Sequence, residues 1–345
     1  MKHKNLFGLF IIILLSALMV FNTGCKKDES NPVDPTPQVN ETEVLLKHFE
    51  ETNDYIHNIP SFVVSASDVR TLQLTNPSKQ LLIDIRAAAD FAAGRIEGAV
   101  NVPFNGLWDY MKNVNPANYD RIVIICYSGQ TSAYATSLIR AMGGFGSKVV
   151  SLKWGMSSWD SVFAQNYWLA KRSNIRAGQF VQTPSPAKNP KGDLPKLNTG
   201  KKTAPEILEA RIKALLAEGY PAATISENTL YSNLSNYYIV NYWSPALYLN
   251  PGHIDGAINY DPSTQPFKST NDLKTLPTNK TTVLYCFTGQ TSSYVGAYLR
   301  LLGYDVKSLT YGANSMIYDL MLAGNVPNTF IPANEIKGYP YITGN

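Results

Sequence analysis

The sequence predicts an α/β protein that contains the same unit twice, each unit a mostly parallel sheet flanked by helices on both faces. One seven-residue loop occurs twice, at residues 126–132 and 286–292, and each copy begins with a cysteine. A short apolar run rich in β-branched residues precedes each loop, and an apolar pattern with helical spacing follows it. The length of 345 residues suits two domains.

The composition is that of a globular protein. Hydrophobic residues make up 44% of the chain and charged residues 16%, which allows a packed core and argues against wholesale disorder. The formal net charge is +4. Removal of a leader containing Lys2 and Lys4 would leave 28 basic against 26 acidic residues, a net charge of +2. This balance gives no basis for a nucleic-acid-binding surface.

The N-terminus has the features of an export signal. Lys2 and Lys4 precede an apolar run over residues 6–21, which is shorter than the roughly 20 residues of a membrane span. The run ends in small residues and Gly24-Cys25, which resembles a bacterial lipoprotein cleavage site. An uncleaved anchor helix is the alternative.

We therefore expect residues 1–24 to be a lipoprotein-type signal peptide and residues 25–40 to be a flexible tether. Lipid would be attached to Cys25 and would hold the protein on a membrane. The domains would then lie outside the cytoplasm at a bacterial cell envelope, on the periplasmic or the surface face.

A leading amphipathic helix is predicted over residues 41–58, with Leu45 and Phe49 on its apolar side. His48 and His57 lie in this segment without a second set of ligands, so no metal site is expected. We predict that the first domain covers residues 41–172.

Each cysteine follows a predicted buried strand and precedes a predicted helix. Residues 121–125 lead into Cys126, and residues 281–285 lead into Cys286. The helices end near Gly143 and Gly303. Each sulfur is thus expected at a helix N-terminus, where free N–H groups and the helix dipole would stabilise a thiolate, a persulfide or a small oxyanion. The loop residues expected to bind substrate or the persulfide are Tyr127, Ser128, Gly129, Gln130, Thr131 and Ser132, and Phe287, Thr288, Gly289, Gln290, Thr291 and Ser292.

A change of composition separates the two units. Residues 173–203 are rich in proline and lysine and are predicted to be a linker, whose lysines are either solvated or attract an anion. Thr203 and Glu206 have capping-box spacing at the start of a second leading helix. The second domain is expected to cover residues 204–345. Tyr134 and Tyr294 lie at helical spacing and are predicted to pack rather than to line a pocket.

Three ordered segments in each unit resemble the rhodanese (sulfurtransferase) family. The first contains Asp84 and Arg86 and continues into residues 94–103, with residues 252–259 as the second copy; the cysteine loop comes next, and residues 149–155 or 306–312 form the third segment. The resemblance implies two rhodanese-like domains with Cys126 and Cys286 as catalytic residues. It also implies that Asp84 and Arg86 support the site.

The resemblance implies a two-step sulfur transfer. The cysteine would take a sulfane sulfur from a small donor, thiosulfate or a thiol persulfide, and would pass it to a thiol or cyanide acceptor. No cofactor and no metal are expected. The alternatives are a non-catalytic binding or sulfur-carrier module, and a disulfide or redox role, for which a bridge between Cys126 and Cys286 would require the two loops to face each other. The oligomeric state stays open.

The chain departs from the family pattern at several positions. Arg95 replaces a histidine in the first copy, and Asn241 and Trp243 replace the Asp-x-Arg pair in the second, so we expect Cys126 to be the better nucleophile. Tyr127 and Phe287 stand where thiosulfate-using members often carry cations.

The residue six positions after each cysteine bears on a second chemistry. Related phosphatases carry an arginine there, which stabilises the transferred phosphoryl group. This chain has Ser132 and Ser292 instead, which argues against phosphatase activity.

Overall fold

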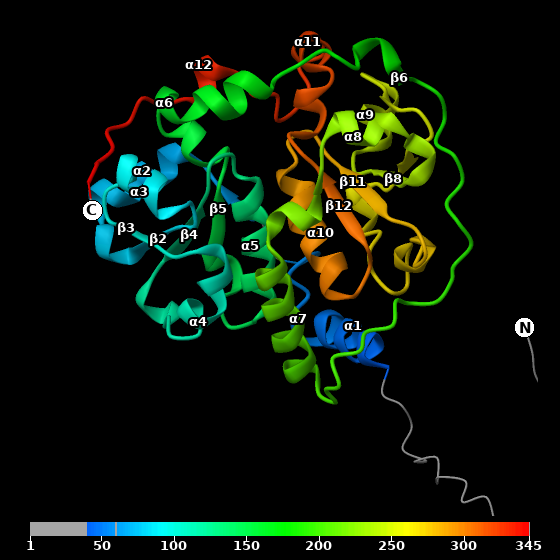
Figure 1. Ribbon diagram of the computed structural model, residues 1–345, viewed down its shortest axis with the longest axis horizontal. Coiled ribbons are helices and arrows are strands. Elements are labelled where there is room, and N and C mark those ends of the chain that lie inside the picture. Colours follow the sequence, from blue (N-terminus) through cyan, green and yellow to red (C-terminus); the bar gives the residue numbers. More distant parts are fainter. Residues whose placement is uncertain (1–39, 59–60, 345) are drawn as a thin grey trace, which may run out of the picture. The chain divides into compact units, whose positions relative to one another are not determined.

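The computed structural model describes residues 40–58 and 61–344 (Figure 1). The predicted signal peptide, the tether up to residue 39 and its lipid-attachment residue Cys25 lie outside the described residues. In the part of the chain that is described, every helix is too short or too polar to cross a membrane.

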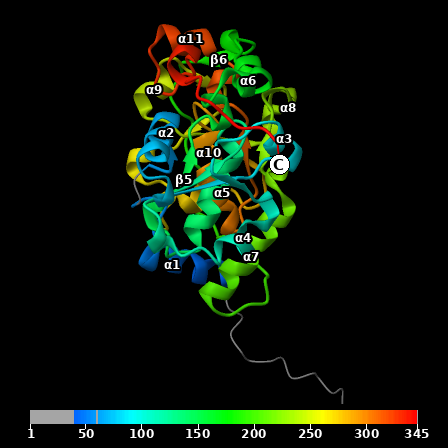
Figure 2. The same cartoon turned by 90° about the vertical axis from the view of Figure 1, so that its left-hand side faces the viewer.

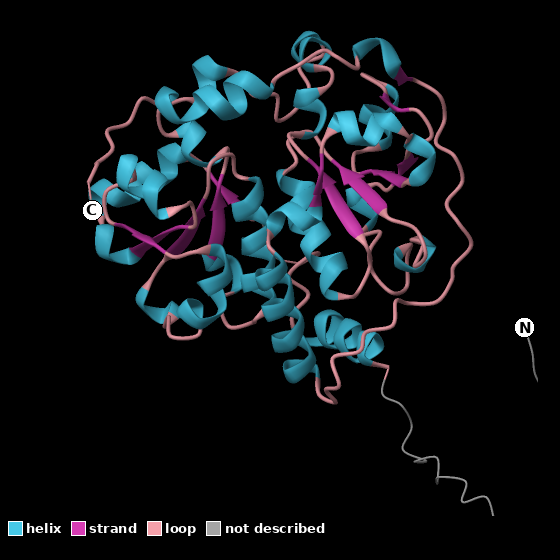
Figure 3. Cartoon of the chain, in the orientation of Figure 1, coloured by secondary structure: helices cyan, strands magenta, loops and turns pink. Residues whose placement is uncertain are grey.

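The described chain forms two five-stranded parallel sheets and a short antiparallel pair (Figure 3). This arrangement confirms the predicted α/β class. The strands are β1 (Val63–Val64), β2 (Gln80–Asp84), β3 (Ala99–Asn101), β4 (Arg121–Ile125), β5 (Val149–Leu152), β6 (Phe180–Val181), β7 (Thr224–Ile225), β8 (Tyr238–Asn241), β9 (His253–Ile254), β10 (Ile258–Asn259), β11 (Thr282–Tyr285) and β12 (Val306–Leu309).

The two parallel sheets have the same topology. Their strand orders are β1-β5-β4-β2-β3 and β7-β12-β11-β8-β10, so the strand before each cysteine lies in the middle of its sheet. The pair β6–β9 joins the linker to the second domain. The helices are α1 (Glu41–Thr52), α2 (Ala66–Thr75), α3 (Ala88–Ala93), α4 (Leu107–Met111), α5 (Gln130–Ala141), α6 (Ser161–Ala164), α7 (Ala204–Glu218), α8 (Glu227–Ser232), α9 (Pro245–Leu249), α10 (Gln290–Leu301), α11 (Tyr318–Ala323) and α12 (Pro332–Glu335).

The two domains share one hydrophobic core. Along β4, Ile122 and Ile124 face this shared core, whereas Val123 and Ile125 face a separate outer cluster, as the period of two along a strand requires. The helices α5 and α10 pack against each other between the two sheets (Figures 1 and 2). The helices that follow the two cysteine loops therefore form the centre of the domain interface.

The leading helices differ in part from the prediction. The first ends at Thr52 rather than near residue 58, because the backbone of Asn53 leaves the helical region (φ −148°, ψ 60°) and a turn with a hydrogen bond from the Asn58 N–H to the Asp54 carbonyl follows. Burial lowers the pKa of His57, although its ring lies 2.6 Å from a carboxylate oxygen of Asp54. In α7 the predicted capping box between Thr203 and Glu206 is present.

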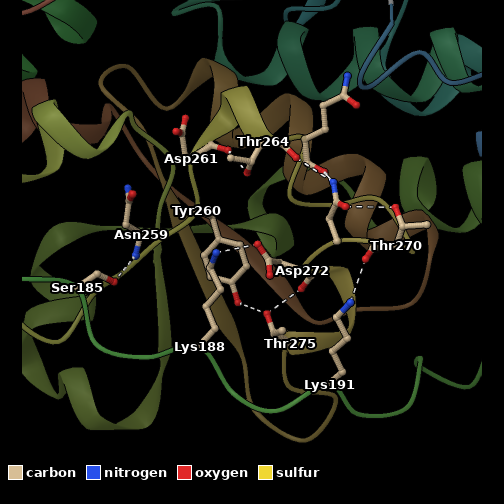
Figure 4. A network of polar contacts seen from close by, with 12 residues as sticks. Ser185, Lys188, Lys191, Asn259, Tyr260, Asp261, Thr264, Thr270, Asp272 and Thr275 are labelled. Atoms are coloured by element: carbon tan, nitrogen blue, oxygen red, sulfur yellow. Dashed lines mark hydrogen bonds and ion pairs between the residues drawn. The ribbon is translucent and has the colours of Figure 1, made fainter.

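The linker lies along the second domain (Figure 4). The hydroxyl of Ser185 accepts a hydrogen bond from the backbone N–H of Asn259 in the edge strand β10, which protects that edge. Lys188 forms an ion pair of 2.7 Å with Asp272, and Lys191 donates to a backbone carbonyl. Lys191 is exposed and Lys188 is half-buried, so both side chains combine contact with solvent and these bonds to the second domain.

The C-terminal segment returns to the first domain (Figure 1). Ile342 forms an antiparallel bridge with Arg95, and the indole N–H of Trp159 donates to the carbonyl of Pro340. Residues 337–344, which the sequence places with the second domain, thus pack on the first.

Candidate active site

Cys126 lies at the carboxyl end of β4, where the loop turns into α5. Its Sγ atom is 3.1 Å from the backbone N of Gly129, 3.3 Å from the backbone N of Ser132 and 3.2 Å from the hydroxyl of Ser132. Gly129 has φ of 84°, a left-handed conformation that favours glycine, and a Cβ there would clash with Gln290. Donors at a helix N-terminus therefore surround the sulfur atom, as the sequence predicts.

Further hydroxyl groups hold this loop in place. The hydroxyl of Ser132 lies 2.7 Å from that of Ser151 in β5, which also donates to the carbonyl of Gly129. Ser128 is buried and accepts a hydrogen bond from the side chain of Gln130, whereas Thr131 is half-buried at the start of the helix.

The second loop repeats this design with longer contacts to the sulfur. The Sγ atom of Cys286 lies 3.3 Å from the backbone N of Ser292 but 3.6 Å from its hydroxyl and 3.8 Å from that of Thr288. The hydroxyl of Ser292 bonds that of Ser308 at 2.7 Å, matching the serine pair of the first domain. Gly289 has φ of 75°, and Thr291 is half-buried.

The two loops face each other across the domain interface. Oε1 of Gln130 accepts a hydrogen bond of 2.8 Å from the backbone N–H of Tyr311, and Oε1 of Gln290 accepts one of 3.2 Å from that of Trp154. Both described cysteines are free thiols. Their residues are only 1% and 3% exposed, for Cys126 and Cys286 respectively.

The predicted support for the site differs between the domains. Arg86 binds Asp84 in two-pronged fashion, at 3.0 Å and 2.7 Å, and also donates to the carbonyl of Gly94. This ion pair is buried at the end of β2, beside β4. In the second domain Asn241 bonds a neighbouring asparagine, and Trp243 stacks on Phe287 with ring centres 4.4 Å apart.

A cavity of about 180 Å³ lies beside the first loop. Tyr127 forms one wall and stacks on Tyr167 with ring centres 4.9 Å apart, and its hydroxyl donates to Asp90. Burial, with this hydrogen bond, raises the pKa of Tyr127 to about 12, so the phenol is neutral at physiological pH. The residues that line the cavity are Arg86, Asp90, Ala93, Tyr127, Val162, Phe163, Asn166 and Tyr167.

Several of these residues were not identified from the sequence. Tyr167 lies in the kinked segment Gln165–Leu169 that continues α6, and its own backbone is not helical (φ −118°, ψ −107°). Trp168 in the same segment donates to the carbonyl of Ser128 at 2.9 Å, which fixes the segment to the cysteine loop. Asp90 is exposed in the first turn of α3. No motif marks these positions, because a cavity wall is assembled from segments distant in sequence.

The described residues contain no candidate metal site. Within residues 40–58 and 61–344, no cluster of three histidine, cysteine, aspartate or glutamate side chains has the geometry for an ion. Tyr134 and Tyr294 are buried in the shared core, as predicted.

Comparison with known proteins agrees with the duplicated architecture. The family model described as the rhodanese-like domain matches residues 65–161 and 228–317, together more than half of the chain. The chain belongs to the rhodanese-like family. The two rhodanese-like ranges lie within the predicted units 41–172 and 204–345.

One curated relative of this rhodanese-like chain is the thiosulfate sulfurtransferase GlpE of Pseudomonas putida (strain GB-1). It is 30% identical over 95 residues, which cover 27% of this chain and 82% of that protein. The similarity corresponds in length to one rhodanese-like domain.

Solved structures with similarity to the chain include two sulfurtransferases. The thiosulfate sulfurtransferase of Pseudomonas aeruginosa is 17% identical, with 88% of this chain and 49% of that chain covered and a TM-score of 0.28. The 3-mercaptopyruvate sulfotransferase SseA of Escherichia coli is 16% identical, with 72% and 97% covered and a TM-score of 0.25.

Proposed function

We propose that the protein is a sulfurtransferase that moves a sulfane sulfur from a small donor to a thiol or cyanide acceptor through a persulfide on Cys126. The main support for this proposal is the set of donors around Sγ of Cys126, which are two backbone N–H groups and one hydroxyl at a helix N-terminus. These donors stabilise a negatively charged sulfur, which both the thiolate and the persulfide carry.

The chemistry proceeds in two displacement steps. The Cys126 thiolate attacks the outer sulfur of the donor; a bond forms between the two sulfur atoms, and the remainder of the donor leaves with its electron pair. For thiosulfate the leaving group is sulfite, and for a thiol persulfide it is a thiolate. An acceptor thiolate or cyanide then attacks the outer sulfur of the persulfide and releases the Cys126 thiolate. Neither step needs a cofactor or an oxidant.

Two features rank Cys126 above Cys286. Its sulfur has three donors within 3.3 Å, and its domain contains the buried Asp84–Arg86 ion pair at the end of the neighbouring strand β2. Thiosulfate and a thiol persulfide both remain candidate donors. No cation follows either cysteine in its loop, which favours the less charged thiol persulfide.

We further propose that the protein acts at a bacterial cell envelope, held to the membrane by lipid on Cys25. The support is the charged start, the apolar run over residues 6–21 and the Gly24-Cys25 pair. Radiolabelled palmitate incorporated into the parent but not into the Cys25→Ala variant would support this anchor. Equal labelling of both, or of neither, would contradict it.

The second candidate function is a non-catalytic binding or sulfur-carrier module. The burial of both sulfur atoms favours this alternative, because a donor must reach the thiol.

Multiple turnover separates the two functions. The rate of sulfur transfer from thiosulfate or glutathione persulfide to cyanide or a thiol is measured for the parent and for the Cys126→Ser/Cys286→Ser double variant. The sulfurtransferase proposal predicts many turnovers per parent molecule and the uncatalysed rate with the double variant. Equal rates for the two proteins would contradict it, and a single turnover by the parent would support the carrier.

A further inference from the structure

Two charged side chains line the cavity beside Tyr127, and of these Asp90 has no ion-pair partner among the described residues. Arg86 also lines the cavity, but its guanidinium is engaged by the buried carboxylate of Asp84 and by the carbonyl of Gly94. Asp90 is exposed at the rim, and its hydrogen bond comes from the neutral hydroxyl of Tyr127. The lining residues together with Asp84 therefore carry a net charge of about −1.

Aromatic rings form much of the cavity wall. The stacked rings of Tyr127 and Tyr167 and the ring of Phe163 line the cavity, and the guanidinium of Arg86 lies 5.7 Å and 5.5 Å from the ring centres of Tyr127 and Phe163. Aromatic faces attract cations through their quadrupole. Arg86 already fills this role at Tyr127 and Phe163, so the exposed carboxylate of Asp90 is the group that would attract the ammonium group of a small ligand and would repel a dianion.

The cavity adjoins the reactive loop. Tyr127 directly follows Cys126, and the kinked segment that carries Tyr167 is fixed to the same loop through Trp168 and the carbonyl of Ser128. Burial raises the pKa of Tyr167, and the charge of Asp90 and the Cys126 sulfur add to this effect in that order. A substrate bound in this cavity would thus lie next to the loop that holds the sulfur.

We propose that this cavity is the binding site for the organic part of the thiol substrate, and that Asp90 makes it select neutral or cationic small thiols, such as aminothiols, over anionic ones. This inference rests on the proposed sulfurtransferase function and specifies its substrate class. Asp90 acts as a specificity residue, and the hydrogen bond from Tyr127 holds its carboxylate at the rim.

The second domain does not repeat this site. The residues at the positions of Arg86, Asp90 and Tyr127 are Trp243, Leu247 and Phe287, and all three pack in one hydrophobic cluster. The charge preference is therefore expected for Cys126 and not for Cys286.

Thiol-reactive probes test the preference without any need for sulfur turnover. The 2-aminoethyl, 2-hydroxyethyl and 2-sulfonatoethyl methanethiosulfonates are nearly equal in size and differ in charge. In each case the Cys126 thiolate attacks the sulfenyl sulfur, a mixed disulfide forms and methanesulfinate leaves. The rate of modification at Cys126 is measured by peptide mapping in the folded Cys286→Ser protein.

Two variants alter the charge of the cavity. Asp90→Asn removes the negative charge, but its amide oxygen can still accept from Tyr127. Asn166→Lys adds a positive charge at an exposed lining position. Asp109→Asn, an exposed position in α4, is the matched control for the loss of one carboxylate.

We expect the aminoethyl reagent to react faster than the sulfonatoethyl reagent, relative to their rates with free cysteine. This ratio should fall about threefold in each cavity variant and stay unchanged in Asp109→Asn. A ratio that is equal in all four proteins, a faster sulfonatoethyl reagent, or no reaction at Cys126 would overturn the inference.

The outcomes for the two proposals are distinguishable. The turnover rate is also measured with cysteamine and with 3-mercaptopropionate as acceptors, and the ratio of these two rates is compared between the variants. Loss of turnover with the reagent preference intact would contradict the sulfurtransferase function. Turnover with no effect of Asp90→Asn on either ratio would contradict only the specificity assigned to Asp90.

Discussion

Each of the two domains has a pair of serine hydroxyl groups at its cysteine loop. Ser132 pairs with Ser151 in the first, Ser292 pairs with Ser308 in the second, and both pairs have hydroxyl oxygens 2.7 Å apart. In the surroundings of the loops the two domains differ. The first domain has the Asp84–Arg86 ion pair and a cavity with a charged rim, whereas the second has stacked aromatic rings.

Features that both copies share belong to the conformation of the loop, whereas features found in one copy bear on its reactivity. The serine pair and the left-handed glycine occur in both copies, so they are requirements of the loop conformation itself. The ion pair and the cavity occur in the first domain, and we propose that they make Cys126 the better nucleophile.

Replacement of each cysteine gives the largest expected difference between the domains. Cys126→Ser should lower the rate of sulfur transfer by at least about a thousandfold, because a hydroxyl cannot form the persulfide. Cys286→Ser should retain at least half of the parent rate. Turnover assays with the same donor and acceptor check both variants. The reverse ranking would mean that the second domain carries the reaction.

Loss of the ion pair should have the next largest effect. Arg86→Met leaves Asp84 buried without its partner and should lower the free energy of unfolding by about 3–5 kcal/mol, as measured by urea denaturation. The double variant Asp84→Asn/Arg86→Met should recover part of this loss, because no buried charge is left unpaired. If the single variant is as stable as the parent, the ion pair does not brace the first domain.

The reciprocal glutamine contacts allow a direct comparison at the interface. Gln290→Met leaves the buried N–H of Trp154 without its acceptor and should cost about 1–3 kcal/mol of unfolding free energy. Gln130→Met should cost less, because Tyr311 is only half-buried and water can reach its N–H group. Thermal denaturation of the two variants side by side measures the difference. Equal stability of both variants and the parent would show that these contacts do not couple the loops.

A smaller effect is expected from His253, which stands where the first domain has Arg95. The ring lies 2.9 Å from the carbonyl of Tyr248 through Nδ1, and burial lowers its pKa below the usual value of about 6.5. The unfolded state therefore binds more protons than the folded state at mildly acidic pH, and stability decreases as the pH falls through about 6.5.

The variant His253→Asn tests this contribution. Its amide can still donate to the carbonyl of Tyr248, but it does not titrate. We expect the free energy of unfolding to decrease less between pH 7.5 and 5.5 in His253→Asn than in the parent, with His57 supplying part of the remaining slope. Identical slopes in urea titrations at the two pH values would exclude His253 as a source.

The fold and the position of both sulfur atoms could be predicted because the sequence signals were local. β-Branched runs, helical spacing and a glycine that tolerates φ of 84° specify a strand, a loop and a helix within about twenty residues. The capping box at Thr203 was local as well. By contrast, the end of α1 at Thr52 depends on the turn at Asn53 and Asp54, which the apolar pattern did not reveal.

The remaining parts of the site depend on contacts between distant segments. Asp90 meets Tyr127, and Trp168 meets Ser128, across about 40 residues. The return of Ile342 to Arg95 spans most of the chain. Residue types and spacing in one sequence contain no information on such pairs, so the cavity walls and the interface contacts emerged only from the three-dimensional structure.

The most direct test of the central claim is the position of the transferred sulfur. The purified protein is exposed briefly to thiosulfate or a thiol persulfide, its intact mass is measured, and peptide mapping assigns any added sulfur before and after an acceptor thiol is supplied. We expect one added sulfur atom on Cys126, and we expect the acceptor to remove this sulfur. Added sulfur on Cys286 alone, or no adduct on folded protein with free thiols, would contradict it.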